Sequence, residues 1–179
     1  MKIAAQNSLE HKMVELKAKA GDHTFLKEKL SKLGAEYVGT FSQSDLYFAV
    51  PEGRLKLREV ECSGVAELIY YDREDVAGPK SDEAFILRVH DSEDLKKILE
   101  KVLKSTVCIE KVREIYVLHG TQIHLDTVKK LGNFIEFERQ TTDDEKQAKR
   151  DRHVLEQLME TLQIEPSNLV TLSYSDLVE

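Results

Sequence analysis

Charged residues recur two positions apart in five short segments of the sequence. These are Glu15, Lys17 and Lys19; Lys56 and Arg58; Lys111 and Arg113; His124 and Asp126; and Glu136 and Glu138. In a β-strand, residues i and i+2 point to the same face, so each segment would present a short charged row. Arginine offers phosphate a planar fork and lysine a compact charge. Carboxylate oxygens suit Mg²⁺ or Mn²⁺. The pattern therefore favours a site for a polyanion together with a divalent metal.

Apolar residues alternate with these charges, as in Val14, Leu16 and Ala18 or in Ile135 and Phe137. The simplest interpretation is a half-exposed antiparallel sheet with its charges in solvent. The solvent-exposed face of a strand, however, usually carries Thr, Tyr and Gln. Two acidic residues on one strand also repel each other unless a cation lies between them. We therefore favour charged rows that line the lumen of a barrel, with the apolar rows packed outward against helices.

The elements that would position these rows follow from periodicity and turn residues. Expected strands are Met13–Ala20, Tyr37–Val50 (as one or two), Arg54–Val60, Ala66–Arg73, Glu83–His90, Val107–Leu118, Thr121–Asp126 and Phe134–Gln140. Expected helices are His23–Leu33, one from Asp91 to about Lys104, and Thr142–Leu162, with a helical turn at Thr127–Leu131 and a short helix from Pro166. This α+β pattern predicts a closed antiparallel β-barrel with helices packed outside, since closure removes sheet edges.

Length and charge limit the classes of function. The 179 residues fit a single domain, 1–179, with residues 1–11 as a flexible or edge N-terminal segment. The net charge of −7 argues against a general nucleic-acid binder but permits a local basic pocket. Neither a membrane-length apolar run nor a cysteine pattern for metal binding is present in the sequence. We expect a cytoplasmic protein with no membrane or nucleic-acid partner, either a monomer or a homodimer.

An ordered set of motifs along the chain resembles the CYTH domain family, which includes class IV adenylyl cyclases, thiamine triphosphatases and inorganic triphosphatases. The motifs are V-E-L-K at Val14–Lys17, G-R-L-K-L-R-E at Gly53–Glu59, E-L-I-Y-Y-D-R at Glu67–Arg73, P-K-S-D-E at Pro79–Glu83, E-K-V-R-E-I-Y at Glu110–Tyr116, the run Ile123–Glu138, and S-Y-S-D-L at Ser173–Leu177. The resemblance implies the family's triphosphate tunnel, an antiparallel barrel of about eight strands.

The resemblance also implies roles for individual residues. Phosphate would be held by Lys17, Lys56, Arg58, Lys80, Lys111 and Arg113, with Lys19 and Arg73 on the same face. Mg²⁺ or Mn²⁺ would be bound by Glu15, Glu136 and Glu138, and the catalytic group would be Asp126, Lys111 and Arg113. Two positions depart from the family pattern: Met13 replaces the first Glu of the opening signature, and Tyr71 stands where a Lys is frequent.

Three functions remain open from the sequence. One is metal-dependent hydrolysis of a triphosphate such as ATP, tripolyphosphate or thiamine triphosphate. The second is the class IV adenylyl cyclase reaction, which forms cyclic AMP and pyrophosphate. The third, suggested by Met13, is non-catalytic binding of nucleotide or polyphosphate. Two side chains are also ambiguous. His124 is more simply a hydrogen-bonded wall residue than a base or metal ligand, and Tyr174 more simply packs a tail than closes the tunnel mouth.

Overall fold

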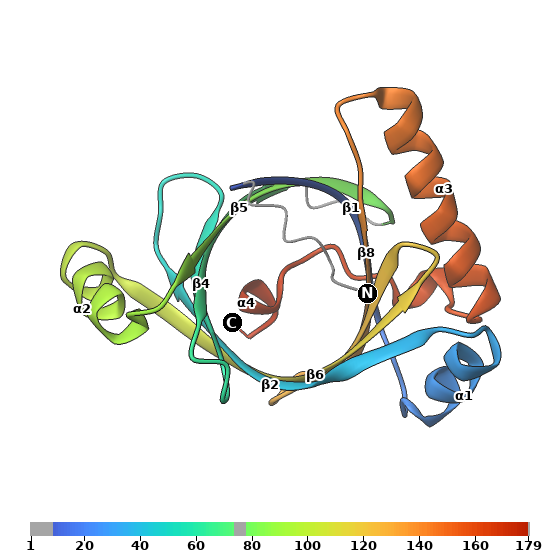
Figure 1. Ribbon diagram of the computed structural model, residues 1–179, viewed down its shortest axis with the longest axis horizontal. Coiled ribbons are helices and arrows are strands. Elements are labelled where there is room, and N and C mark those ends of the chain that lie inside the picture. Colours follow the sequence, from blue (N-terminus) through green and yellow to red (C-terminus); the bar gives the residue numbers. More distant parts are fainter. Residues whose placement is uncertain (1–8, 74–77, 179) are drawn as a thin grey trace.

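The structure, a computed structural model, describes residues 9–73 and 78–178 and is built on one closed antiparallel barrel (Figure 1). In the described residues, its strands are β1 (Glu10–Lys19), β2 (Glu36–Phe48), β3 (Arg54–Val60), β4 (Ala66–Arg73), β5 (Lys80–Val89), β6 (Ser105–Leu118), β7 (Thr121–Val128) and β8 (Gly132–Gln140). Around the barrel they follow the order β1-β5-β4-β3-β2-β6-β7-β8. The expected α+β fold with a closed antiparallel barrel is confirmed.

The outer face of the barrel carries the apolar rows that alternate with the charges. Val14, Leu16 and Ala18 of β1 and Ile135 and Phe137 of β8 are all buried there. They pack with leucines of α1 (Thr24–Lys32) and α3 (Glu145–Thr161). Burying one such side chain contributes about 1.5–3 kcal/mol, so this outer core fixes which face of each strand turns inward.

A second, smaller apolar cluster fastens α2 (Ser92–Val102) to the opposite side of the barrel. Leu99 of the helix packs there with Phe48, Leu57 and Ala66. The three long helices therefore lie outside the barrel, as expected (Figure 1).

The C-terminal segment turns into the barrel instead of lying on it. After the 3-10 turn Pro166–Asn168, the Val170 amide donates to the Lys17 carbonyl oxygen at 2.9 Å. The short helix α4 (Tyr174–Leu177) then lies within the ring of strands (Figure 1). Ser173 and Asp176 form a capping box at its start, which satisfies donors that so short a helix leaves unpaired. A helix within the lumen was not expected from the sequence.

Two local expectations need comment. The helical turn predicted at Thr127–Leu131 is wrong, because β7 continues to Val128 and pairs with Gly132 before the chain turns. At the N-terminus, β1 begins at Glu10, so the last two residues of segment 1–11 lie opposite β5, and residues 1–8 lie outside the described part.

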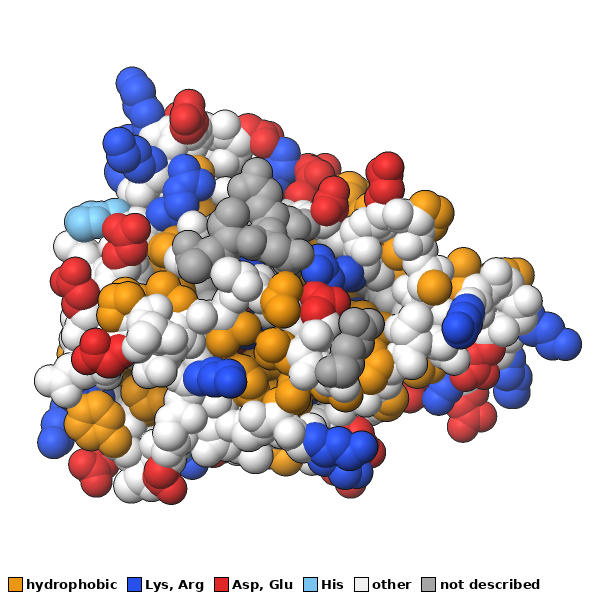
Figure 2. Space-filling model, turned by 180° about the vertical axis from the view of Figure 1, so that it is seen from behind, with side chains coloured by type: hydrophobic (Ala, Val, Ile, Leu, Met, Phe, Trp, Pro, Cys, Tyr) orange, Lys and Arg blue, Asp and Glu red, His pale blue; other side chains and the backbone are white. Residues whose placement is uncertain are grey.

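The outer surface mixes charges of both signs. Figure 2 shows Lys and Arg side chains interspersed with Asp and Glu around the periphery of one face, with hydrophobic side chains gathered nearer its middle. Among the described helices, none combines the length and apolar character needed to cross a membrane.

Candidate active site

The lumen holds a cavity of about 100 Å³ lined by charged rows from the strands and by the C-terminal segment. Its lining residues are Met13, Glu15, Lys17, Tyr47, Lys56, Arg58, Ile69, Tyr71, Asp82, Ala84, Ile86, Lys111, Arg113, Glu136, Glu138, Ser173 and Tyr174. The inward placement of the charged rows, inferred above from strand parity alone, is therefore confirmed for these residues.

Asp45 of β2 organises the first group of cations. Both of its oxygens accept from Arg58, at 2.7 and 2.8 Å, and the Lys56 Nζ lies 3.2 Å away. The Lys111 Nζ lies 3.5 Å from the same carboxylate. Asp45 is only 1% exposed, so three cations from two strands converge on one buried charge.

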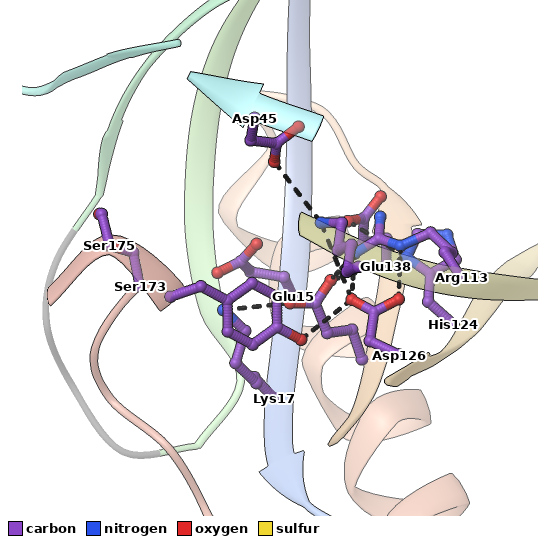
Figure 3. Close-up of polar contacts among 12 residues, drawn as sticks. Glu15, Lys17, Asp45, Arg113, His124, Asp126, Glu138, Ser173 and Ser175 are labelled. Atoms are coloured by element: carbon purple, nitrogen blue, oxygen red, sulfur yellow. Dashed lines mark hydrogen bonds and ion pairs between the residues drawn. The ribbon is translucent and has the colours of Figure 1, made fainter. Parts of the chain in front are cut away.

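Arg113 of β6 organises the second group. It donates to both oxygens of Asp126 at 2.7 and 2.6 Å and to Glu136 Oε2 at 2.6 Å. The other Glu136 oxygen lies 3.0 Å from the Lys17 Nζ. The register explains this network, because Arg113 lies opposite Asp126 in the β6–β7 pair and Lys17 lies opposite Glu136 in the β1–β8 pair (Figure 3).

Burial and charge together set the ionisation of these groups. Burial disfavours the carboxylates, yet the surrounding cations hold the pKa values of Asp45 and Glu136 well below their usual range and also lower that of Asp126. For Lys111, burial and the charge of Arg113 outweigh the attraction of Asp45 and lower the pKa to about 7. A lysine with so low a pKa is partly neutral at pH 7.

Tyr174 of α4 brings the C-terminal segment into the second group. Its hydroxyl donates to Asp126 at 3.0 Å, and the Lys17 Nζ lies 4.0 Å from the centre of its ring. The ring also meets Phe134 edge-on at 5.0 Å. Tyr174 therefore both packs the tail and lines the lumen cavity, which combines the two alternatives left open by the sequence.

The remaining predicted phosphate and metal residues lie in different settings. Lys80 is buried, donates to the Thr171 carbonyl oxygen at 2.8 Å, and lies 3.8 Å from Glu15. Lys19 is exposed at the end of β1. Arg73 is the last residue of β4, and its side chain lies outside the described residues. The two departures, Met13 and Tyr71, both line the lumen.

Sequence reasoning missed Asp45, the residue with the most cationic neighbours in this network. It lies in the run F-S-Q-S-D-L-Y-F, which has polar residues on both faces. The alternation therefore does not predict which face of the strand points into the barrel. One signal was available: Asp45 is the only acidic residue between Tyr37 and Val50, in a chain whose lumen rows already held an excess of Lys and Arg.

His124, Glu136 and Glu138 together form a group that could hold a metal ion. One ligand atom from each lies within 4.8 Å of the others. The His124 Nδ1 atom is buried and has no hydrogen-bond partner among the described residues. An orphaned nitrogen beside two carboxylates fits a cation. The group contains two of the three predicted metal ligands, Glu136 and Glu138, and has His124 instead of Glu15.

Comparison with known proteins agrees with this geometry. The family model for the CYTH domain matches residues 11–174. A Methanocaldococcus jannaschii protein with the provisional name adenylate cyclase is 30% identical over 92% of this chain and 97% of its own length.

Solved structures share the fold. A Pyrococcus horikoshii protein superposes with a TM-score of 0.83 at 22% identity, covering 93% of this chain and 99% of its own. A Hippeastrum protein, provisionally an adenylyl cyclase and described as having a dominant triphosphatase activity, superposes with a TM-score of 0.66 at 17% identity over 93% of each chain. The barrel is the triphosphate tunnel expected from the sequence, and the chain belongs to the CYTH domain family.

Proposed function

We propose that this chain is a metal-dependent enzyme that hydrolyses inorganic or organic triphosphates within its lumen. The observation that carries the proposal is the convergence of Lys17, Lys56, Arg58, Lys111 and Arg113 on one cavity. In the free protein, buried carboxylates neutralise these cations. A triphosphate supplies a chain of anionic oxygens that can take over those ion pairs, and arginine and lysine suit such oxygens.

A metal ion would complete the balance of charge. Because the lumen carries carboxylates as well as cations, a bound triphosphate would place its negative charge beside those carboxylates, and a metal ion would offset their repulsion. Mg²⁺ or Mn²⁺ held by Glu15, Glu136 and Glu138 would neutralise phosphate oxygens and act as a Lewis acid. The chain's own contribution is to grip the phosphates along the tunnel, with Arg113 and Lys111 facing the oxygens that gain charge in phosphoryl transfer.

The setting of Asp126 supports a positioning role within the proposed catalytic group. Its two oxygens hold the Arg113 fork, and it also accepts from Tyr174. Although burial opposes its ionisation, Arg113 and Lys111 lower its pKa, which makes it a weak base. We therefore assign Asp126 to orient Arg113 toward the transferring phosphoryl group.

The second candidate is the adenylyl cyclase reaction, and one structural observation favours it. A cavity of about 740 Å³ lies beside the lumen and shares Met13 and Asp82 with it. A nucleoside attached to a lumen-bound triphosphate needs such a space next to the tunnel. The provisional name of the Methanocaldococcus jannaschii relative points the same way.

Product identification separates the candidates. Purified protein is incubated with tripolyphosphate, thiamine triphosphate or ATP, each with Mg²⁺ or Mn²⁺, and the products are separated by ion-exchange chromatography. We expect orthophosphate without cyclic AMP. Cyclic AMP and pyrophosphate from ATP would establish the cyclase instead. Binding of all three compounds without any product would leave the non-catalytic alternative.

Protonation of Lys111 on ligand binding offers a test of the proposal that needs no turnover. Because its pKa is about 7 in the free protein, much of it is neutral at pH 8.5. A bound triphosphate would favour the charged form, so binding should protonate Lys111 at that pH. Calorimetry of metal-free tripolyphosphate binding in two buffers of different ionisation enthalpy measures this uptake.

The control for proton uptake compares two lysines. Lys111→Met should lose the part of the buffer-dependent heat that comes from this proton. Lys97→Met, at an exposed position of α2 paired with Asp94, should keep it. Uptake that persists in Lys111→Met would show that another group takes the proton.

A further inference from the structure

His124 stands between two carboxylates on the inner wall of the barrel. It lies on β7, directly opposite Glu136 of β8 in the strand register, with Glu138 one step along the same face. Its Nδ1 atom is 3.7 Å from Glu136 Oε2 and 3.6 Å from Glu138 Oε1. His124 is 2% exposed, so water reaches it poorly.

The other ring nitrogen fixes which way the imidazole presents its lone pair. The Nε2 atom lies 3.2 Å from the Gln122 side-chain oxygen, an acceptor that calls for a proton on Nε2. In neutral imidazole the proton on Nε2 leaves Nδ1 with a bare lone pair. When the ring is neutral, that lone pair faces two carboxylates, an arrangement that is repulsive unless a cation lies between them. A histidine metal ligand is commonly held this way, with its second nitrogen donating to a nearby oxygen.

The spacing leaves room for an ion. Two atoms can share an ion only if they are closer than twice the metal–ligand distance, or about 4.2 Å for bonds of about 2.1 Å. Both distances from Nδ1 satisfy this limit, yet both are too long for hydrogen bonds. The three ligand atoms lie within 4.8 Å of one another, so they need to move only slightly closer to share one ion. A small rotation of the less buried Glu138 would achieve this.

The charges around the group support a cation there. Glu136 is already held by Lys17 and Arg113, which fixes its position but leaves lone pairs on both oxygens. Glu138 lies opposite Glu15 in the β1–β8 register, which places a third carboxylate on the neighbouring strand. The two carboxylates that face the imidazole, Glu136 and Glu138, both come from β8, whereas Glu15 belongs to β1.

We propose that His124 is a nitrogen ligand of the lumen metal site and makes the site prefer Mn²⁺ to Mg²⁺. The inference rests on the proposed function for the presence of a metal, and adds which ion is selected. Mg²⁺ favours oxygen ligands and retains its waters, whereas imidazole suits the softer first-row ions. A site made only of the three glutamates would give no such preference.

The test is spectroscopic and needs no turnover. Wild-type protein is loaded with Mn²⁺ alone, and electron spin echo envelope modulation is recorded. A directly bound imidazole gives ¹⁴N modulation, which should change when the protein is labelled with ¹⁵N-histidine. Competition between the ions, followed by the signal of free Mn²⁺, should show Mn²⁺ binding at least about tenfold tighter than Mg²⁺.

Variants then assign the nitrogen. His124→Ala should remove the ¹⁴N modulation and weaken Mn²⁺ binding by roughly 10–100-fold, with Mg²⁺ binding nearly unchanged. His124→Gln, which keeps a polar side chain of similar size, should also lose the modulation, and its melting curve shows whether the fold is intact. The matched control, His153→Ala on the exposed face of α3, should behave as wild type.

The outcomes separate this inference from the proposed function. Mn²⁺ bound without ¹⁴N modulation, or Mn²⁺ binding no tighter than Mg²⁺, would overturn the role of His124 while orthophosphate release still supports the hydrolase. Failure of Mn²⁺ to bind at all would also overturn it. Absence of any product with either ion would count against the proposed function, whatever ligand the spectra reveal.

Discussion

Arg113→Ala is expected to abolish triphosphate turnover and to destabilise the fold. Arg113 is the shared cation of Asp126 and Glu136, with contacts of 2.6–2.7 Å to both. Removing it leaves two buried carboxylates facing each other, which costs about 3–5 kcal/mol in the free energy of unfolding. Under the proposed function it also removes a donor to the phosphoryl group, worth about 10²–10³ in kcat. Initial rates with tripolyphosphate and thermal melts measure the two effects.

Two further variants separate catalysis from stability. Arg113→Lys keeps the charge but lacks the planar fork, so it should recover much of the stability and little of the rate. The matched control is Arg139→Ala, which breaks a 2.7 Å pair with buried Asp151 outside the lumen. This control should lower the melting temperature while turnover per folded molecule stays at the wild-type value. Full activity in Arg113→Ala would refute the assigned role.

The sequence predicts those site residues whose direction follows from the alternation of charged and apolar residues along a strand. In Lys56 and Arg58, or Glu136 and Glu138, two charges flank an apolar residue, and only one arrangement buries the apolar row. The outer packing of Leu57 or Phe137 then forces the charges inward. Local sequence is sufficient here because each strand carries both halves of the pattern.

The rest depends on contacts between distant segments. The polar run around Asp45 has Ser44 on its outer face and Gln43 on its inner one, so no apolar row fixes its direction. Only the approach of Arg58 and Lys111 from neighbouring strands gives Asp45 its role. Helix α4 is too short for a helical period, and its place is set by the lumen residues that its Tyr174 meets.

Asp45→Asn tests the residue that the sequence did not reveal. The change keeps the size of the side chain but removes the charge that Lys56, Arg58 and Lys111 share as an ion-pair partner. Lys56 and Arg58 would then be left without their buried partner, and we expect a loss of about 3–5 kcal/mol in the free energy of unfolding. For a chain of this length that corresponds to a fall of roughly 6–20 °C in melting temperature.

The pH dependence of this loss has a defined sign. Burial opposes ionisation of Asp45, but Arg58, Lys56 and Lys111 hold its pKa well below the usual range. A group with a depressed pKa stabilises the fold above its unfolded-state pKa, and this stabilisation is lost as the pH falls toward the folded-state value. The difference in melting temperature between wild type and Asp45→Asn should therefore be full at pH 7 and should shrink below about pH 4.

A polyanion should reverse the damage, because Asp45→Asn frees cations that a phosphate chain can bind. Ligand that binds only the folded state raises stability with its concentration, so metal-free tripolyphosphate should raise the melting temperature of Asp45→Asn more than that of wild type. Asp94→Asn, at an exposed pair with Lys97, should change stability by less than about 0.5 kcal/mol and show the wild-type response. If Asp45→Asn melts as wild type does, or if tripolyphosphate stabilises it no more than wild type, then Asp45 does not hold the place of a bound phosphate. If the expected rescue is seen, the buried carboxylate of the free protein marks where one phosphate of the substrate lies.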